Sequence, residues 1–218
     1  MKEATEVFQA KPALRGTSHL LATVLALLGG LHLLIVAPPG SGPPVLVYVA
    51  SLLALFGVSA LYHKPMWKNS IRSRLRRLDH STIFIFIAAT YTPICLLALP
   101  HEIGQPLLAM VWICATLGVI KSLFWVGAPR LVTALLYVAM GWLAVGSLGA
   151  LPAALGAQGV GLLFAGGAIY TLGAILYALK WPEPFPGIFG HHEVFHALVI
   201  VAAICHFTLI RAIVIEAV

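Results

Sequence analysis

Residues 189–213 read FGHHEVFHALVIVAAICHFTLIRAI, and this stretch decides the fold class. After His196 it continues as a predominantly apolar run to Ile213, in which His206, Thr208 and Arg211 are the polar residues. A transmembrane helix needs about 20 predominantly apolar residues. In lipid, the backbone of such a segment must satisfy its own hydrogen bonds, and a helix does so. The stretch therefore predicts a helix that spans a membrane, with several histidines at its beginning.

Six other segments of the chain have the same character. Short segments with proline and glycine separate most of them, and the segment between residues 63 and 79 is rich in lysine and arginine instead. With residues 189–213 as the seventh, the predicted spans cover residues 17–37, 44–63, 79–99, 106–126, 131–150 and 158–179. We therefore expect an all-α integral membrane protein. A seven-helix bundle forms a single domain over residues 17–215, and residues 1–16 form a short cytoplasmic segment before it.

The composition supports the membrane assignment, because 61% of the residues are hydrophobic and only 9% are charged. Soluble domains carry roughly 25% charged residues. The net charge of +6 could suggest nucleic acid as a partner. We exclude that class because the basic residues fall in short loops between predicted spans rather than on a soluble surface.

The basic residues also predict the orientation, since short cytoplasmic loops carry an excess of lysine and arginine. With the N-terminus in the cytoplasm, twelve of the thirteen Lys and Arg residues lie on the inner side, and only Arg211 lies outside. The three outer loops contain none. The seven spans then place the C-terminus outside the cell.

Histidines and a carboxylate gather at the inner ends of three predicted spans. His192 and His196 are four residues apart, so both project from one face of a helix, a spacing that suits two metal ligands. His63 ends the second span, Asp79 begins the third, and Ser59 lies one turn deeper than His63. Three histidines leave one open position in a tetrahedral zinc site, which is the arrangement of catalytic sites. We expect the carboxylate to orient or deprotonate a water there.

The spacing alone leaves two questions open. Histidines at helix ends are often interfacial hydrogen-bonding residues, so the spacing does not decide whether a metal is bound. Residues 192–196 also match the HExxH pattern of zinc proteases literally, in which the glutamate is the general base. On this reading, Glu193 and Asp79 compete for the role of base.

Three motifs resemble those of the haemolysin III family, within the progestin and adipoQ receptor superfamily. Ser59–His63 is similar to the family's S-x-x-x-H segment, and Gly190–His196 resembles its FGxHExFH segment. Leu78–Ile83 followed by Ala89–Pro93 is similar to LDHSxI and GTYTP, with Ala89 where the family usually has glycine. The resemblance covers roughly residues 15–213.

The resemblance implies a bound Zn²⁺ whose ligands are His63, His192 and His196. We choose His192 over the adjacent His191, because only His192 lies four residues from His196. Ser59 and Asp79 belong to the same constellation in this family, with Asp79 near the open position of the metal. The resemblance thereby favours Asp79 over Glu193 as the base.

The resemblance also defines three candidate functions. The superfamily includes alkaline ceramidases, which implies a zinc-dependent hydrolase of a lipid amide or ester. In it, Asp79 and Ser59 are catalytic, and membrane lipids are partners. One alternative is a non-catalytic receptor or regulator of membrane state with a structural zinc. The other is a pore-forming haemolysin. We expect the protein in a bacterial inner membrane, with the metal site on the cytoplasmic side.

Overall fold

The computed structural model describes residue 12 and residues 14–216 of the chain. Lys2 and Lys11, which entered the orientation argument, lie outside the described residues. Within the described part, the helices are α1 (Thr17–Val36), α2 (Gly42–His63), α3 (Asn69–Pro93), α4 (His101–Phe124), α5 (Arg130–Gly141), α6 (Leu151–Leu179) and α7 (His191–Glu216). A π-helical segment, η1 (Ile94–Ala98), continues α3, and a short 3₁₀ segment, η2 (Leu143–Ser147), continues α5.

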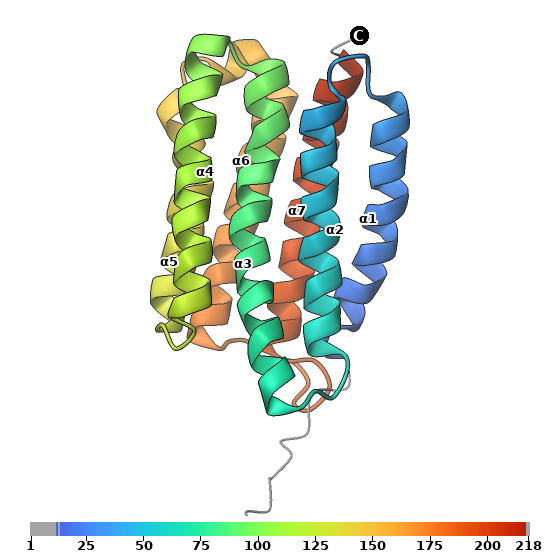
Figure 1. Ribbon diagram of the computed structural model, residues 1–218, viewed down its shortest axis with the longest axis vertical. Coiled ribbons are helices and arrows are strands. Elements are labelled where there is room, and N and C mark those ends of the chain that lie inside the picture. The colour runs from blue at the N-terminus through green and yellow to red at the C-terminus, as the bar shows by residue number, and fades with distance from the viewer. Residues whose placement is uncertain (1–11, 13, 217–218) are drawn as a thin grey trace, which may run out of the picture.

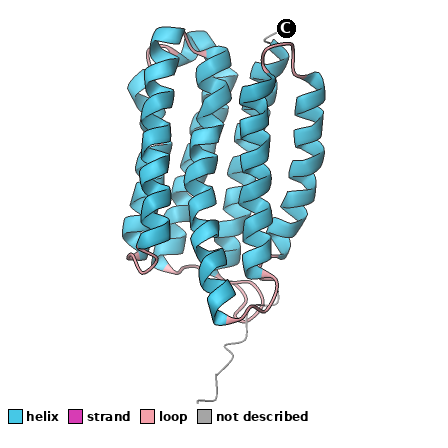
Figure 2. Ribbon diagram, viewed as in Figure 1, coloured by secondary structure: helices cyan, strands magenta, loops and turns pink. Residues whose placement is uncertain are grey.

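The predicted seven spans are confirmed, because seven described segments are long and apolar enough to cross a membrane. The helices run roughly parallel to one axis and alternate in direction, and the chain is helical almost throughout (Figures 1 and 2). The most extensive contacts join α6 to α7, α2 to α3, α3 to α4 and α1 to α2. The protein is therefore an integral membrane protein with seven candidate spans.

Three helices begin at least five residues earlier than the sequence predicts. The start of α3 is Asn69 rather than residue 79, so its arginine-rich first turns are helical and extend beyond the neighbouring helices (Figure 1). The start of α4 is His101, because Pro106 removes only one hydrogen bond near the helix end. The start of α6 is Leu151, and this helix is interrupted at Gly156, whose φ of 64° lies in the left-handed region.

One end of the bundle carries most of the positive charge, and we call it the basic end. It contains the first turns of α1, α3, α5 and α7 and the last turns of α2, α4 and α6. Its described basic residues are Arg15, Lys64, Lys68, Arg72, Arg74, Arg76, Arg77, Lys121, Arg130 and Lys180. Arg211 lies near the opposite end, in the last turns of α7.

Candidate metal centre

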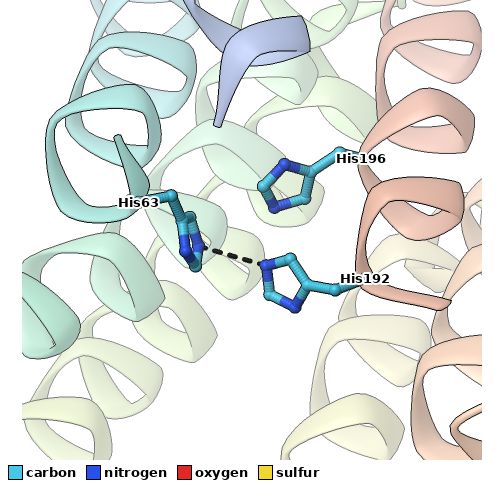
Figure 3. A group of neighbouring side chains, drawn as sticks. All are labelled: His63, His192 and His196. Carbon is cyan, nitrogen blue, oxygen red and sulfur yellow. Dashed lines mark hydrogen bonds between the residues drawn. The ribbon is translucent and has the colours of Figure 1, made fainter. Parts of the chain in front are cut away.

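Three histidines meet near the basic end, inside the bundle. His63 is the last residue of α2, and His192 and His196 lie on successive turns at the start of α7 (Figure 3). One ring nitrogen from each lies within 4.8 Å of the others. The Nε2 atoms of His63 and His192 are 3.2 Å apart. The fold therefore brings together the three histidines that the sequence predicted as metal ligands.

The donor set fits a metal ion. Zinc–nitrogen bonds of roughly 2.0–2.1 Å in tetrahedral geometry separate two ligand atoms by about 3.3 Å. The distance of 3.2 Å between the His63 and His192 nitrogens is close to this value. Each neutral imidazole also has a lone pair that needs a partner when it is buried. A single ion would satisfy all three, so the cluster could hold a divalent metal.

Asp79 and Ser59 lie beside this cluster, as predicted. Asp79 Oδ2 is 3.9 Å from His63 Nε2, and both side chains are almost buried. Ser59 is one turn before His63 on α2, and its hydroxyl is placed to hydrogen-bond the Asp79 carboxylate. The three residues predicted as ligands and the two predicted as catalytic groups therefore lie close together.

Glu193, the competing base, faces elsewhere. Its carboxylate pairs with the Arg15 guanidinium, and its Oε2 accepts a hydrogen bond of 2.9 Å from the Gly190 backbone N–H. The second contact returns to the backbone just before the first turn of α7, as in a capping box. Glu193 is 2% exposed and holds the start of α7 to the segment before α1. The structure thus gives Glu193 a structural task.

His191, the other candidate ligand, also points away from the cluster. Its ring nitrogen Nδ1 contacts the Glu183 carboxylate in the loop between α6 and α7. This hydrogen bond holds the pKa of Glu183 below its usual value. The geometry agrees with the choice of His192 made from its spacing to His196.

Replacing Glu193 by alanine should lower the free energy of unfolding by about 1–3 kcal/mol, through loss of the cap and of a buried hydrogen-bonding partner for Arg15. Chemical unfolding in detergent, followed by far-UV circular dichroism, measures this change. Glu183→Ala is the matched control, because it removes a carboxylate from an exposed pair and should change stability little. Unchanged stability of Glu193→Ala would contradict the structural role.

His19, which was not among the predicted site residues, lies against the cluster. The side chain is 3% exposed, and its ring stacks on that of His196, with centroids 3.8 Å apart and planes 7° apart. The sequence did contain one indication of this position, because His19 is the third residue of the first predicted span and so lies at the same depth as His63. His19 therefore forms part of the wall around the candidate ligands.

A cavity of about 430 Å³ opens beside the histidines. Five helices, α2, α3, α5, α6 and α7, supply most of its wall. It reaches inward past the cluster to apolar side chains such as Phe86, Phe164 and Val199. Tyr91 closes part of this wall: its hydroxyl donates to the Gly141 carbonyl at 2.6 Å and accepts from the Ala144 N–H at 2.9 Å. The histidine cluster thus borders a space lined largely by apolar groups.

Comparison with known proteins gives matches over most of the chain. The model of the family described as Haemolysin-III related matches residues 8–207. The "Hemolysin-3 homolog" of Bacillus subtilis (strain 168) is 36% identical over 154 residues, which are 71% of this chain and 69% of that protein. "Hemolysin-3" of Bacillus cereus is 35% identical over 155 residues, 71% of this chain and 67% of that protein. The human "Monocyte to macrophage differentiation factor" is 29% identical over 171 residues, 74% of this chain and 66% of that protein.

Proposed function

The chain belongs to the haemolysin III family, within the progestin and adipoQ receptor superfamily, and on that premise we propose that it is a zinc-dependent hydrolase of a lipid amide or ester. The proposal rests on one observation, which is the set of groups that lie side by side at the cavity. Three histidine nitrogens, a nearly buried carboxylate and a hydroxyl border a largely apolar cavity within a membrane bundle. A receptor with a purely structural zinc would not need a carboxylate beside an accessible cavity.

His63, His192 and His196 would hold a zinc ion, which would polarise a carbonyl group and lower the pKa of a water toward about 7. The chain's own residues then handle the protons. Asp79 accepts a proton from the attacking water as the water oxygen bonds to the carbonyl carbon. Ser59 hydrogen-bonds the carboxylate and fixes its orientation. Asp79 returns the proton to the departing amine or alkoxide as the carbon–nitrogen or carbon–oxygen bond breaks, which leaves a fatty acid.

The orientation is part of the proposal. The excess of lysine and arginine at the basic end supports a cytoplasmic location for that end, by the positive-inside rule. The bacterial relatives support a bacterial inner membrane. The histidine cluster would then lie near the cytoplasmic surface, where water and polar head groups reach it. The deeper apolar part of the cavity would hold the acyl chain.

The proposal is tested by product release. Purified protein loaded with zinc is incubated with N-acyl and O-acyl lipids, and free fatty acid is measured by mass spectrometry. We expect hydrolysis that a chelator reduces by about a hundredfold or more and that added zinc restores.

Three outcomes would contradict the proposed hydrolase activity. If the protein keeps its zinc and releases no fatty acid from either class of lipid, the proposal is wrong. A sharp loss of thermal stability on metal removal, without any turnover, would favour the structural site of a receptor. Leakage from liposomes at low protein ratios, again without turnover, would favour the pore-forming alternative.

A further inference from the structure

One face of α3 lines the cavity along almost its whole length, and its chemistry changes from end to end. At the basic end, the face carries Arg72 and Arg76, which are one turn apart. Asp79 follows at the level of the histidines, and Ile83 and Ile87 follow further in. The spacing of three or four residues keeps all these side chains on one side of the helix. The cavity therefore has a cationic mouth, a polar middle and an apolar interior.

Most of the positive charge at the mouth is not paired with a carboxylate among the described residues. Arg15, Arg72, Arg76 and Arg130 line the cavity from three parts of the chain, and Asp79 is the one carboxylate among the described lining residues. Arg15 is paired with Glu193, which does not line the cavity. Within residues 14–216, no carboxylate forms an ion pair with Arg72, Arg76 or Arg130. The guanidinium groups of Arg72 and Arg76 are therefore available to a ligand.

The orientation rule for membrane proteins does not explain where these arginines point. Lysine and arginine favour the cytoplasmic side whichever way their side chains face. Arg74 and Arg77 lie on the same turns of α3 and satisfy that rule, but they are not part of the cavity wall. An arginine that faces the cavity gains an ionic partner there only if an anion enters the cavity. Arg74 and Arg77 are thus matched controls that the helix itself provides.

We infer that Arg72 and Arg76 form an anion-binding subsite at the mouth of the cavity, so that its ligand is a lipid with a phosphate or carboxylate in its head group. The inference rests on the proposed function where it calls this lipid the substrate. Guanidinium groups bind both kinds of anion through paired hydrogen bonds. Arg130, placed over the Tyr177 ring at 5.6 Å, adds positive charge from the other side.

The helix also sets the length of the head group. Arg76 lies three positions and Arg72 lies seven positions before Asp79, which correspond to about 5 and 10 Å along the helix axis. The anionic group therefore lies only a few bonds from the scissile amide or ester at the level of the histidines. On the other side, the cavity wall continues along α3 from Asp79 to Tyr91, about 18 Å, which suits an acyl chain.

A binding experiment tests the subsite without turnover. The probes are two ether-linked lysolipids with the same dibrominated alkyl chain, one with a phosphate head group and one with phosphocholine. Bromine quenches tryptophan fluorescence, and Trp142 lines the inner part of the cavity. The part of the fluorescence quenching that disappears in a Trp142→Phe variant measures how much of the cavity is occupied by the lipid. With zinc-loaded protein, we expect the phosphate-headed lipid to bind about tenfold more tightly than its zwitterionic partner.

The Arg72→Gln/Arg76→Gln variant should lose this preference, whereas Arg74→Gln/Arg77→Gln, which removes the same charge, should keep it. On the unmodified protein, the preference should weaken at high salt, because partly exposed charges are screened. Equal binding of the two lipids to the unmodified protein would overturn the inference. So would an equal loss in both double variants, or displacement of the phosphate-headed lipid by inorganic phosphate, which would mark a site for free phosphate. Fatty-acid release is measured separately, so failure here leaves the hydrolase proposal intact.

Discussion

Replacing His192 by alanine is expected to abolish stoichiometric metal binding. The purified wild-type protein should carry about one metal ion per chain and the variant less than about a tenth of that, because two imidazoles alone do not make a stable three-nitrogen site. Metal content after desalting, measured by mass spectrometry of the element, gives the result. Fatty-acid release should be lost with the metal.

The thermal transition provides a second readout for His192→Ala. A metal held by His63 on α2 and by two histidines on α7 joins helices that are distant in the sequence, so the bound ion stabilises the folded bundle. The midpoint should therefore fall on chelation in the wild-type protein and should not respond to chelation in the variant.

His191→Ala is the matched control for this experiment. His191 is the neighbouring residue on the same first turn, yet its ring contacts Glu183 and lies outside the cluster. We expect full metal content in this variant. A variant of His191 that loses the metal while His192→Ala retains it would show that the ligand was assigned to the wrong histidine.

The spans could be predicted from sequence because lipid imposes a simple rule on composition and length. The ends of the helices could not. The third span is predicted to begin at residue 79 because the preceding segment is rich in arginine. That segment is helical from Asn69, since charged residues at the aqueous end of a spanning helix are no obstacle to helix formation.

The candidate ligands could be predicted because their spacing and depth follow from helix geometry. The spacing of His192 and His196 is local, and the depth of His63 follows from the end of its span. The choice between Asp79 and Glu193 could not be made in this way, since both lie at the inner ends of spans. It depends on a contact between Glu193 and Arg15, which are 178 positions apart in the chain. The motif resemblance favoured Asp79, and the structure places its carboxylate 3.9 Å from His63 Nε2, while its role as the base stays a prediction.

The positions of His19 and of the cavity-facing arginines could not be predicted from the sequence. The basic residues at the inner end served only as a measure of orientation, because a sequence does not show which of them point inward. The division of α3 into Arg72 and Arg76 on one side and Arg74 and Arg77 on the other appears only when the cavity is placed. The packing of the helices therefore determines which side chains can contact a bound lipid, and the sequence alone does not show that packing.

Asp79→Asn is expected to reduce hydrolysis by about 10²–10⁴-fold while leaving the metal bound. Asparagine keeps the size of the side chain and can still contact Ser59, but its amide cannot accept a proton from water at neutral pH. The rate of fatty-acid release at saturating lipid measures the effect, and metal content measured on the same sample shows that the three histidines are intact.

The matching variant of the competing carboxylate, Glu193→Gln, separates the two candidate bases. Glu193 pairs with Arg15 and caps α7, so its loss should destabilise the fold without a comparable change in the rate per metal-loaded molecule. The opposite result, with Asp79→Asn active and Glu193→Gln inactive, would assign the chemistry to the HExxH pattern. If both folded variants hydrolyse lipid at the wild-type rate, neither carboxylate is the base. Because Asp79 is the only carboxylate among the described residues lining the cavity, proton transfer would then have to be assigned to groups other than carboxylates there.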